Sequence, residues 1–85
     1  MKYVIKNNLP EEESGQLLKR FGSLADMYTA TARNMFMKVL EYFRNRPGIK
    51  VIFVWYRDEK RKPLRGSIQV EIDGFYYYVE LFKMK

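Results

Sequence analysis

Apolar residues recur at helical spacing from Leu17 to Phe43. At 100° per residue, the apolar side chains of this segment fall within one arc of about 160°, and the charged side chains occupy the opposite face. The phase does not slip along the segment, so the pattern predicts one long amphipathic helix that ends at Pro47-Gly48. Gly22-Ser23 lies inside it and combines a helix-ending glycine with a helix-starting serine, which predicts a kink or a break at this point.

Two features are predicted before this helical pattern. "KYVIK" (2–6) is a short apolar run flanked by lysines, as is typical of an edge strand. "NNLPEEES" (7–14) indicates a helix start. Proline is tolerated in the first turn, and the three glutamates complement the positive end of the helix dipole.

The last third of the chain predicts three strands. They are "IKVIFVWYR" (49–57), "GSIQVEI" (66–72) and "FYYYVELFK" (75–83), and Asp73-Gly74 between the last two is a strong signal for a two-residue hairpin turn. The predicted order is therefore β-α-β-β-β. It describes a single α+β domain over residues 1–85, with a small, mostly antiparallel sheet and one long helix, kinked or broken, packed on one face. The position of the first strand in the sheet does not follow from the sequence.

The predicted hairpin determines which side chains share a face. The turn places Ile72 opposite Phe75, Val70 opposite Tyr77 and Ile68 opposite Val79. These residues and Leu81 form the apolar face that is expected to receive the helix. The other face carries Ser67, Gln69, Glu71, Tyr76, Tyr78, Glu80 and Phe82. The preceding strand adds to that outer face either Val51, Phe53 and Trp55 or Ile52, Val54 and Tyr56. Both alternatives make the outer face unusually aromatic.

The positive charge of the chain is concentrated in one segment. The 85 residues include 16 Lys and Arg against 10 Asp and Glu, for a net charge of +6. Residues 44–65 hold eight of the cations and two of the anions, so this segment carries the whole excess. A concentrated positive field attracts nucleic acid, acidic proteins or anionic lipid. The alternative is a charged, solvated face that maintains solubility.

The composition argues against catalysis and against a membrane location. The sequence has no histidine and no cysteine, so the commonest general base, the thiol nucleophile and nearly all transition-metal ligand sets are missing. We therefore expect no enzyme, no cofactor and no metal. The longest apolar run, "VIFVWY" (51–56), is far shorter than the roughly 20 residues of a membrane span, and the N-terminus lacks the features of a signal peptide. We expect no membrane partner and a cytoplasmic location.

These patterns favour a non-catalytic module that binds nucleic acid or a nucleoprotein complex. Single-strand binders combine aromatic faces, which stack on bases, with cations that neutralise phosphate. The predicted contacts to nucleic acid, or to an acidic protein partner, are Arg57, Lys60, Arg61, Lys62, Arg65, Arg44, Arg46 and Lys50. The predicted stacking or interface residues are Trp55, Tyr76, Tyr78 and Phe82. By size and composition alone, the chain also resembles small regulators or inhibitors from phages and mobile elements.

The alternative function is a self-associating protein–protein adaptor that binds no nucleic acid. A straight helix over residues 17–43 would be about 40 Å long, whereas a strand of seven or eight residues reaches only about 25 Å. The helix would then overhang the sheet and expose the predicted homodimer contacts, which are Leu17, Leu18 and Phe21. A break that folds this segment back onto the core would remove the overhang.

Overall fold

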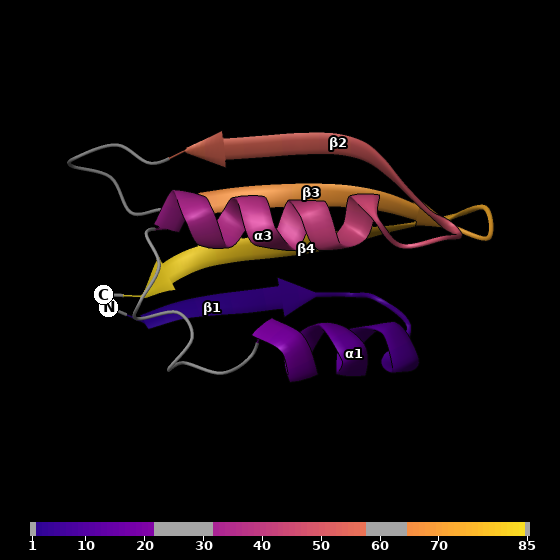
Figure 1. Cartoon of the computed structure of the whole chain (residues 1–85), viewed down its shortest axis with the longest axis horizontal. Helices are drawn as coiled ribbons and strands as arrows, with labels where there is room; N and C mark the ends of the chain where they lie inside the picture. The colour runs from indigo at the N-terminus through magenta and orange to yellow at the C-terminus, as the bar shows by residue number, and fades with distance from the viewer. Residues whose placement is uncertain (1, 22–31, 58–64, 85) are drawn as a thin grey trace.

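The computed structural model describes residues 2–21, 32–57 and 65–84, and among them it contains an antiparallel sheet and two helices (Figure 1). The strands are β1 (Lys2–Asn7), β2 (Ile49–Arg57), β3 (Arg65–Ile72) and β4 (Phe75–Met84), and the helices are α1 (Glu11–Phe21) and α3 (Ala32–Arg44). The strand order is β1-β4-β3-β2, and every neighbouring pair is antiparallel. The predicted α+β class is confirmed, and β1 lies at an edge of the sheet, as its lysine-flanked sequence predicts.

The helical part of the chain differs from the predicted single long helix. Helix α1 ends at Phe21 and α3 begins at Ala32, and the two helices run in opposite directions (Figure 1). The predicted break at Gly22-Ser23 lies outside the described residues. Each helix turns its apolar side toward the same core, so hydrophobic periodicity alone does not distinguish one helix axis from two.

The predicted ends of the helical region agree with the structure. Helix α1 begins at Glu11, just after Pro10, whose carbonyl accepts a hydrogen bond from the Ser14 amide at 2.8 Å. Helix α3 ends at Arg44, three residues before Pro47. Gly48 then adopts a φ of 83°, a left-handed conformation that glycine accepts without steric cost.

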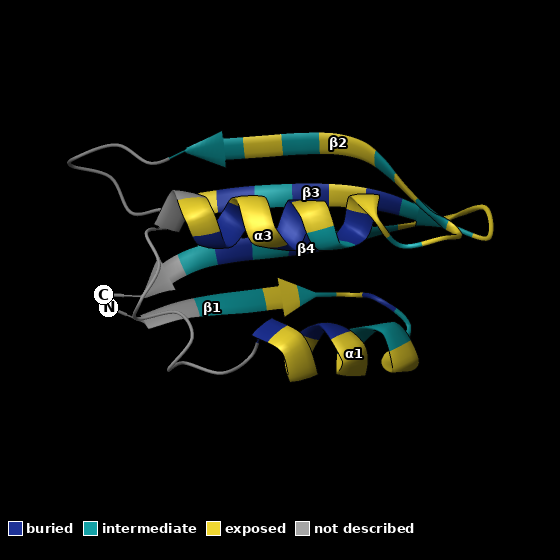
Figure 2. Cartoon of the chain, viewed as in Figure 1, coloured by how far each residue is buried: buried dark blue, intermediate teal, exposed yellow. Residues whose placement is uncertain are grey.

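Both helices pack on one face of the sheet (Figure 1), and the buried side of α3 faces the strands (Figure 2). The core comprises Leu9, Leu17, Phe21, Met35, Phe36, Val39, Leu40, Phe43, Ile68, Val70, Val79 and Leu81. The apolar face predicted from the hairpin register is therefore confirmed for its central residues. Phe75, which the register also places there, is 67% exposed beside the turn, because the helix layer does not cover that end of the hairpin.

The Asp73-Gly74 turn has the conformation that its sequence predicts. The φ angles of Asp73 and Gly74 are 52° and 84°, and two consecutive positive values are the mark of a type I′ hairpin turn. The pairs Ile72–Phe75, Val70–Tyr77 and Ile68–Val79 are all present in the β3–β4 register.

An irregularity in β2 changes which of its side chains point to the outer face. The register with β3 shifts between Val51 and Phe53, as in a β-bulge, where one extra residue reverses the alternation that follows. Val51 packs against the core, but so do Val54 and Tyr56 beyond the bulge. Phe53 and Trp55 consequently point to the outer face. Neither of the two predicted alternations describes the whole strand.

Gly66 of β3 lies directly against the ring of Phe36, so a larger residue at this position is expected to lower the stability of the fold. A Cβ on Gly66 would overlap Cε2 and Cδ2 of that ring. The ring is 2% exposed and packs against Tyr56 with centroids 4.9 Å apart. We expect Gly66→Ala to lower the free energy of unfolding by about 1–3 kcal/mol, because overpacking displaces a ring in a filled core. Urea denaturation measures the change.

Gly15→Ala is the matched control for this substitution. A Cβ on Gly15 meets no atom within 4 Å, and alanine is the better helix former by about 1 kcal/mol. The control should therefore leave stability unchanged or raise it. Equal unfolding free energies for the two variants would contradict the close packing of Phe36 on β3.

Candidate nucleic-acid interface

The sheet face opposite the helices carries two rows of aromatic side chains. They lie on β4 and β2, on either side of β3, which contributes polar residues between them. The rows are Tyr76, Tyr78 and Phe82 on β4 and Phe53 and Trp55 on β2. Two strand spacings separate the rows by roughly 10 Å. Neither described helix covers this surface, which we call the outer face (Figure 1).

The register aligns the two rows across β3. Gln69 pairs with Tyr78 on one side and with Phe53 on the other, and Ser67 pairs with Glu80 and Trp55 in the same way. The exposed fractions of Phe53, Trp55 and Tyr76 are 51%, 41% and 69%. Tyr78 and Phe82 are half-buried. The outer face therefore presents accessible ring surface on both sides of a polar strip.

Two arginines face each other at one end of this surface. Arg57 at the end of β2 and Arg65 at the start of β3 are direct register partners. Like charges directly opposite on neighbouring strands destabilise a sheet. The Arg57 guanidinium lies 5.8 Å from the centroid of the Trp55 ring, and its Nε is buried without a hydrogen-bond partner among the described residues. The Arg65 Nη2 is 3.9 Å from Glu80 Oε2, and the Arg65 side chain is 58% exposed.

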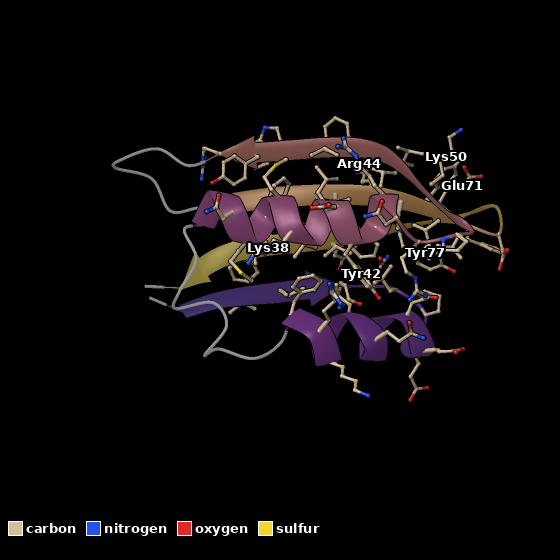
Figure 3. All side chains as sticks on the ribbon, in the orientation of Figure 1. Lys38, Tyr42, Arg44, Lys50, Glu71 and Tyr77 are labelled. Carbon is tan, nitrogen blue, oxygen red and sulfur yellow. The ribbon has the colours of Figure 1, made fainter. Side chains whose placement is uncertain are left out.

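The remaining described charges of the outer face are largely matched across strands. Lys50 on β2 is the register partner of Glu71 on β3, and Figure 3 shows both residues at the same end of the sheet. Lys6 on β1 is the partner of Glu80 on β4. Arg57 and Arg65 are described cations of this face that are register partners of each other, with Glu80 the carboxylate nearest to Arg65.

The structure does not bring all the predicted cations together. Arg44 is exposed on α3, on the helix side of the molecule (Figure 3). Arg46 lies on that side too, where its Nη2 donates to both carboxylate oxygens of Glu13, at 2.6 and 2.7 Å. This ion pair joins the end of α3 to the first turn of α1. Lys60, Arg61 and Lys62 lie outside the described residues.

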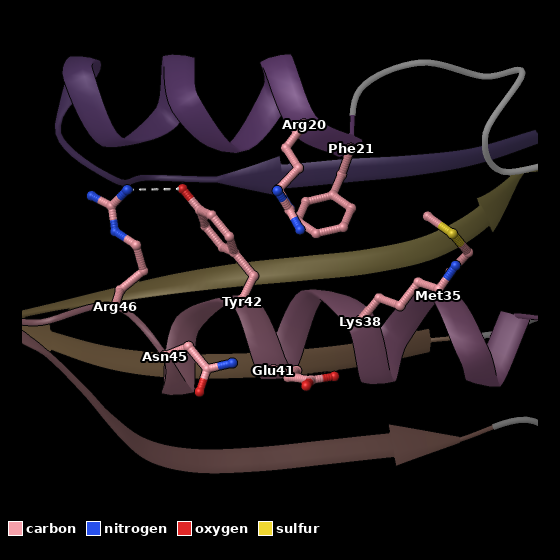
Figure 4. Close-up of a pocket in the computed structure, with 8 residues that line it drawn as sticks. All are labelled: Arg20, Phe21, Met35, Lys38, Glu41, Tyr42, Asn45 and Arg46. Atoms are coloured by element: carbon pink, nitrogen blue, oxygen red, sulfur yellow. Dashed lines mark hydrogen bonds between the residues drawn. The ribbon is translucent and has the colours of Figure 1, made fainter.

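A groove of about 660 Å³ lies between the two helices (Figure 4). Its lining residues are Arg20, Phe21, Met35, Lys38, Glu41, Tyr42, Asn45 and Arg46. Tyr42 lies between two guanidinium groups, with Arg20 5.8 Å and Arg46 5.5 Å from its ring centroid. Its hydroxyl also accepts a hydrogen bond from Arg46 Nη1 at 3.3 Å. The groove is on the helix side and is separate from the outer face.

Two of the three residues predicted to form a homodimer contact are buried in the core of the chain itself. Leu17 is fully buried and Phe21 is 7% exposed, and both belong to the core. Leu18 is 44% exposed. The overhang expected from a straight helix is absent from the described residues, because α1 folds back beside α3 onto the same core.

Two residues of the outer face, Phe53 and Gln69, have positions that the sequence alone does not determine. The sequence allows Phe53 on the outer face as one of two alternatives, and its spacing of two from Trp55 indicates that both share a face. The alternation of β3 predicts the face of Gln69 but not its neighbours on β2. Its position between two aromatic rings depends on the β2 register, which the bulge sets.

Comparisons with protein-family models, with curated proteins and with solved structures gave no significant match to this chain. In the part of the chain that the structure describes, neither helix has the length and apolar character needed to cross a membrane.

Proposed function

We propose that the protein is a non-catalytic binding module that holds single-stranded nucleic acid on the outer face of its sheet. The observation that carries the proposal is the facing pair Arg57 and Arg65 beside two aromatic rows. A phosphate between the two guanidinium groups relieves their mutual repulsion and gains charge-assisted hydrogen bonds. Bases attached to that phosphate then lie over the rings.

Single strands suit this surface better than duplexes do. Aromatic stacking requires bases that are free of a partner, and open four-stranded sheets that bind RNA stack two or three bases. The outer face offers rings on both sides of β3, on two strands that are two strand spacings apart. A duplex keeps its bases stacked internally and would present only phosphates to the arginines.

The number of cations that contact phosphate can be measured, because the segment between the two arginines is also basic. Lys60, Arg61 and Lys62 lie between Arg57 and Arg65 in the sequence. Single-strand affinity falls with a slope of about 0.7 per neutralised phosphate on a logarithmic salt scale. Two phosphate contacts therefore weaken binding about sevenfold between 50 and 200 mM salt, and five contacts weaken it about 130-fold. The slope of the logarithm of affinity against the logarithm of salt concentration therefore gives the number of cations that contact phosphate.

The first test measures binding of labelled single-stranded DNA and RNA, and of matched duplexes, at these two salt concentrations. We expect single strands to bind more tightly than duplexes and the affinity to fall within the range given above. Solution mass is measured in parallel. A dimeric mass without binding of any strand at 50 mM salt would contradict the proposal and favour the self-associating adaptor.

A ring-removal variant tests the stacking contribution. Trp55→Ala should weaken single-strand binding by roughly 5-fold to 150-fold, because stacking on one base contributes about 1–3 kcal/mol. Met37→Ala removes an apolar side chain of similar exposure, 47%, from the helix side and should leave affinity unchanged. Equal affinities for the two variants, with both proteins folded by circular dichroism, would exclude Trp55 from the binding surface.

A further inference from the structure

The strand charges of the outer face do not balance among the side chains that the structure describes. These charged residues are Lys6, Lys50, Arg57, Arg65, Glu71 and Glu80. Four positive and two negative charges leave a net charge of +2. Each lysine is the register partner of one of the two glutamates, so the excess corresponds to Arg57 and Arg65.

The arginine pair lies at one end of the aromatic rows. Arg57 is the last residue of β2, Arg65 is the first residue of β3, and Phe82 is the register partner of Arg65 on β4. From this level the other rings of the outer face continue in one direction, toward the Asp73-Gly74 turn, and Trp55 is the first of them on β2. A short strand whose bases cover these rings consequently has one end beside the arginine pair.

The end of a strand can carry more charge than an internal phosphate does. A phosphomonoester carries a charge of about −1.5 to −2 at neutral pH, whereas an internal phosphodiester carries a single negative charge. Two guanidinium groups are matched by a dianion, which accepts charge-assisted hydrogen bonds from both. Arg57 is half-buried, and salt screens a charge in such a position less than an exposed one.

We infer that Arg57 and Arg65 bind the terminal phosphate of a single strand, so that the preferred ligand of the outer face is a strand with a phosphorylated end. The inference rests on the proposed function, because it specifies the class of ligand for that same surface. The recognised group is the phosphomonoester, which either the 5′ or the 3′ end of a strand can carry.

The experiment measures, by isothermal titration calorimetry at about 50 mM salt, the binding of uridine heptamers that differ only at their ends. One has hydroxyl groups at both ends, one has a 5′-phosphate, one has a 3′-phosphate, and two more carry the methyl esters of these phosphates. We expect one phosphorylated heptamer to bind about 10-fold or more tightly than the hydroxyl strand, the effect of one additional charge-assisted hydrogen bond. Its methyl ester has a single negative charge and should bind within about threefold of the hydroxyl strand.

Arg65→Gln tests whether the arginine pair recognises the end. The Arg65 side chain is 58% exposed, so thermal unfolding should not change, whereas the preference for the phosphorylated end should fall to about twofold or less. Arg44→Gln is the matched control. It removes the same charge from an exposed position on α3 and should keep the full preference.

The outcomes separate this inference from the proposed function. Absence of binding to every heptamer overturns both. Equal binding of the phosphorylated and hydroxyl strands overturns only the recognition of a terminal phosphate, and so does a methyl ester that binds as tightly as its free phosphate. A preference that persists in Arg65→Gln also overturns it, because other cations would then hold the phosphate.

Discussion

Val39→Asp is expected to abolish the native fold. Val39 is 1% exposed in the middle of α3 and belongs to the core between that helix and the sheet. An unpaired carboxylate at this position loses its hydration without gaining a partner, which costs several kcal/mol. A domain of this size has a total stability of about 4–13 kcal/mol. Far-UV and near-UV circular dichroism with urea denaturation should show the loss of a cooperative transition.

Met37→Asp provides the matched control on the same helix. Met37 is 47% exposed, so aspartate at this position buries no charge, and its helix-propensity cost is at least as large as at Val39 because methionine is the better helix former. We expect its unfolding free energy to lie within about 1 kcal/mol of the parent protein. A Val39→Asp protein that unfolds as cooperatively as this control would contradict the placement of α3 against the sheet.

The strands and the hairpin could be predicted because their signals are local. Strict alternation in residues 66–72 and the Asp73-Gly74 dipeptide determine the β3–β4 register within one turn. The same register predicted the aromatic outer face, which the structure places opposite the helices. Local chemistry also marked the start of α1 after Pro10.

The arrangement of the helices and the strand that pairs with β1 could not be predicted, because both depend on contacts distant in sequence. Helical periodicity shows which side of a turn is buried but not whether the axis reverses between Phe21 and Ala32. The pairing of β1 with β4 joins the two ends of the chain. Its closure is supported by Asn8, whose Oδ1 accepts a hydrogen bond from the Tyr78 amide at 2.7 Å.

Which basic residues become neighbours also depends on contacts distant in sequence. In the sequence, Arg44, Arg46, Arg57 and Arg65 belong to one basic segment. The fold separates them. Arg44 and Arg46 lie on the helix side of the sheet, whereas Arg57 and Arg65 are on strands and belong to the outer face. Arg46 pairs with Glu13, 33 residues away, whereas Arg57 and Arg65 become neighbours. Net charge per segment therefore predicted that a basic surface exists without identifying which cations share it.

Replacing both facing arginines should separate binding from stability. We expect Arg57→Gln/Arg65→Gln to weaken single-strand binding about 100-fold or more at 50 mM salt, because hydrogen bonds to charged groups contribute about 1.5–3 kcal/mol each. The logarithmic salt slope should fall by about 1.4. Stability should hold or rise slightly, since the like-charge repulsion across β2 and β3 disappears. Fluorescence anisotropy and thermal unfolding measure the two effects.

Lys38→Gln/Arg44→Gln is the control that isolates position from net charge. Both residues are exposed on α3, and both double variants lower the net charge from +6 to +4. A long-range field from the whole protein would weaken binding equally in the two variants, and that result would contradict a site on the outer face. If the control binds as the parent does while the Arg57/Arg65 variant fails, phosphate is held between β2 and β3, because only there has the paired charge been removed.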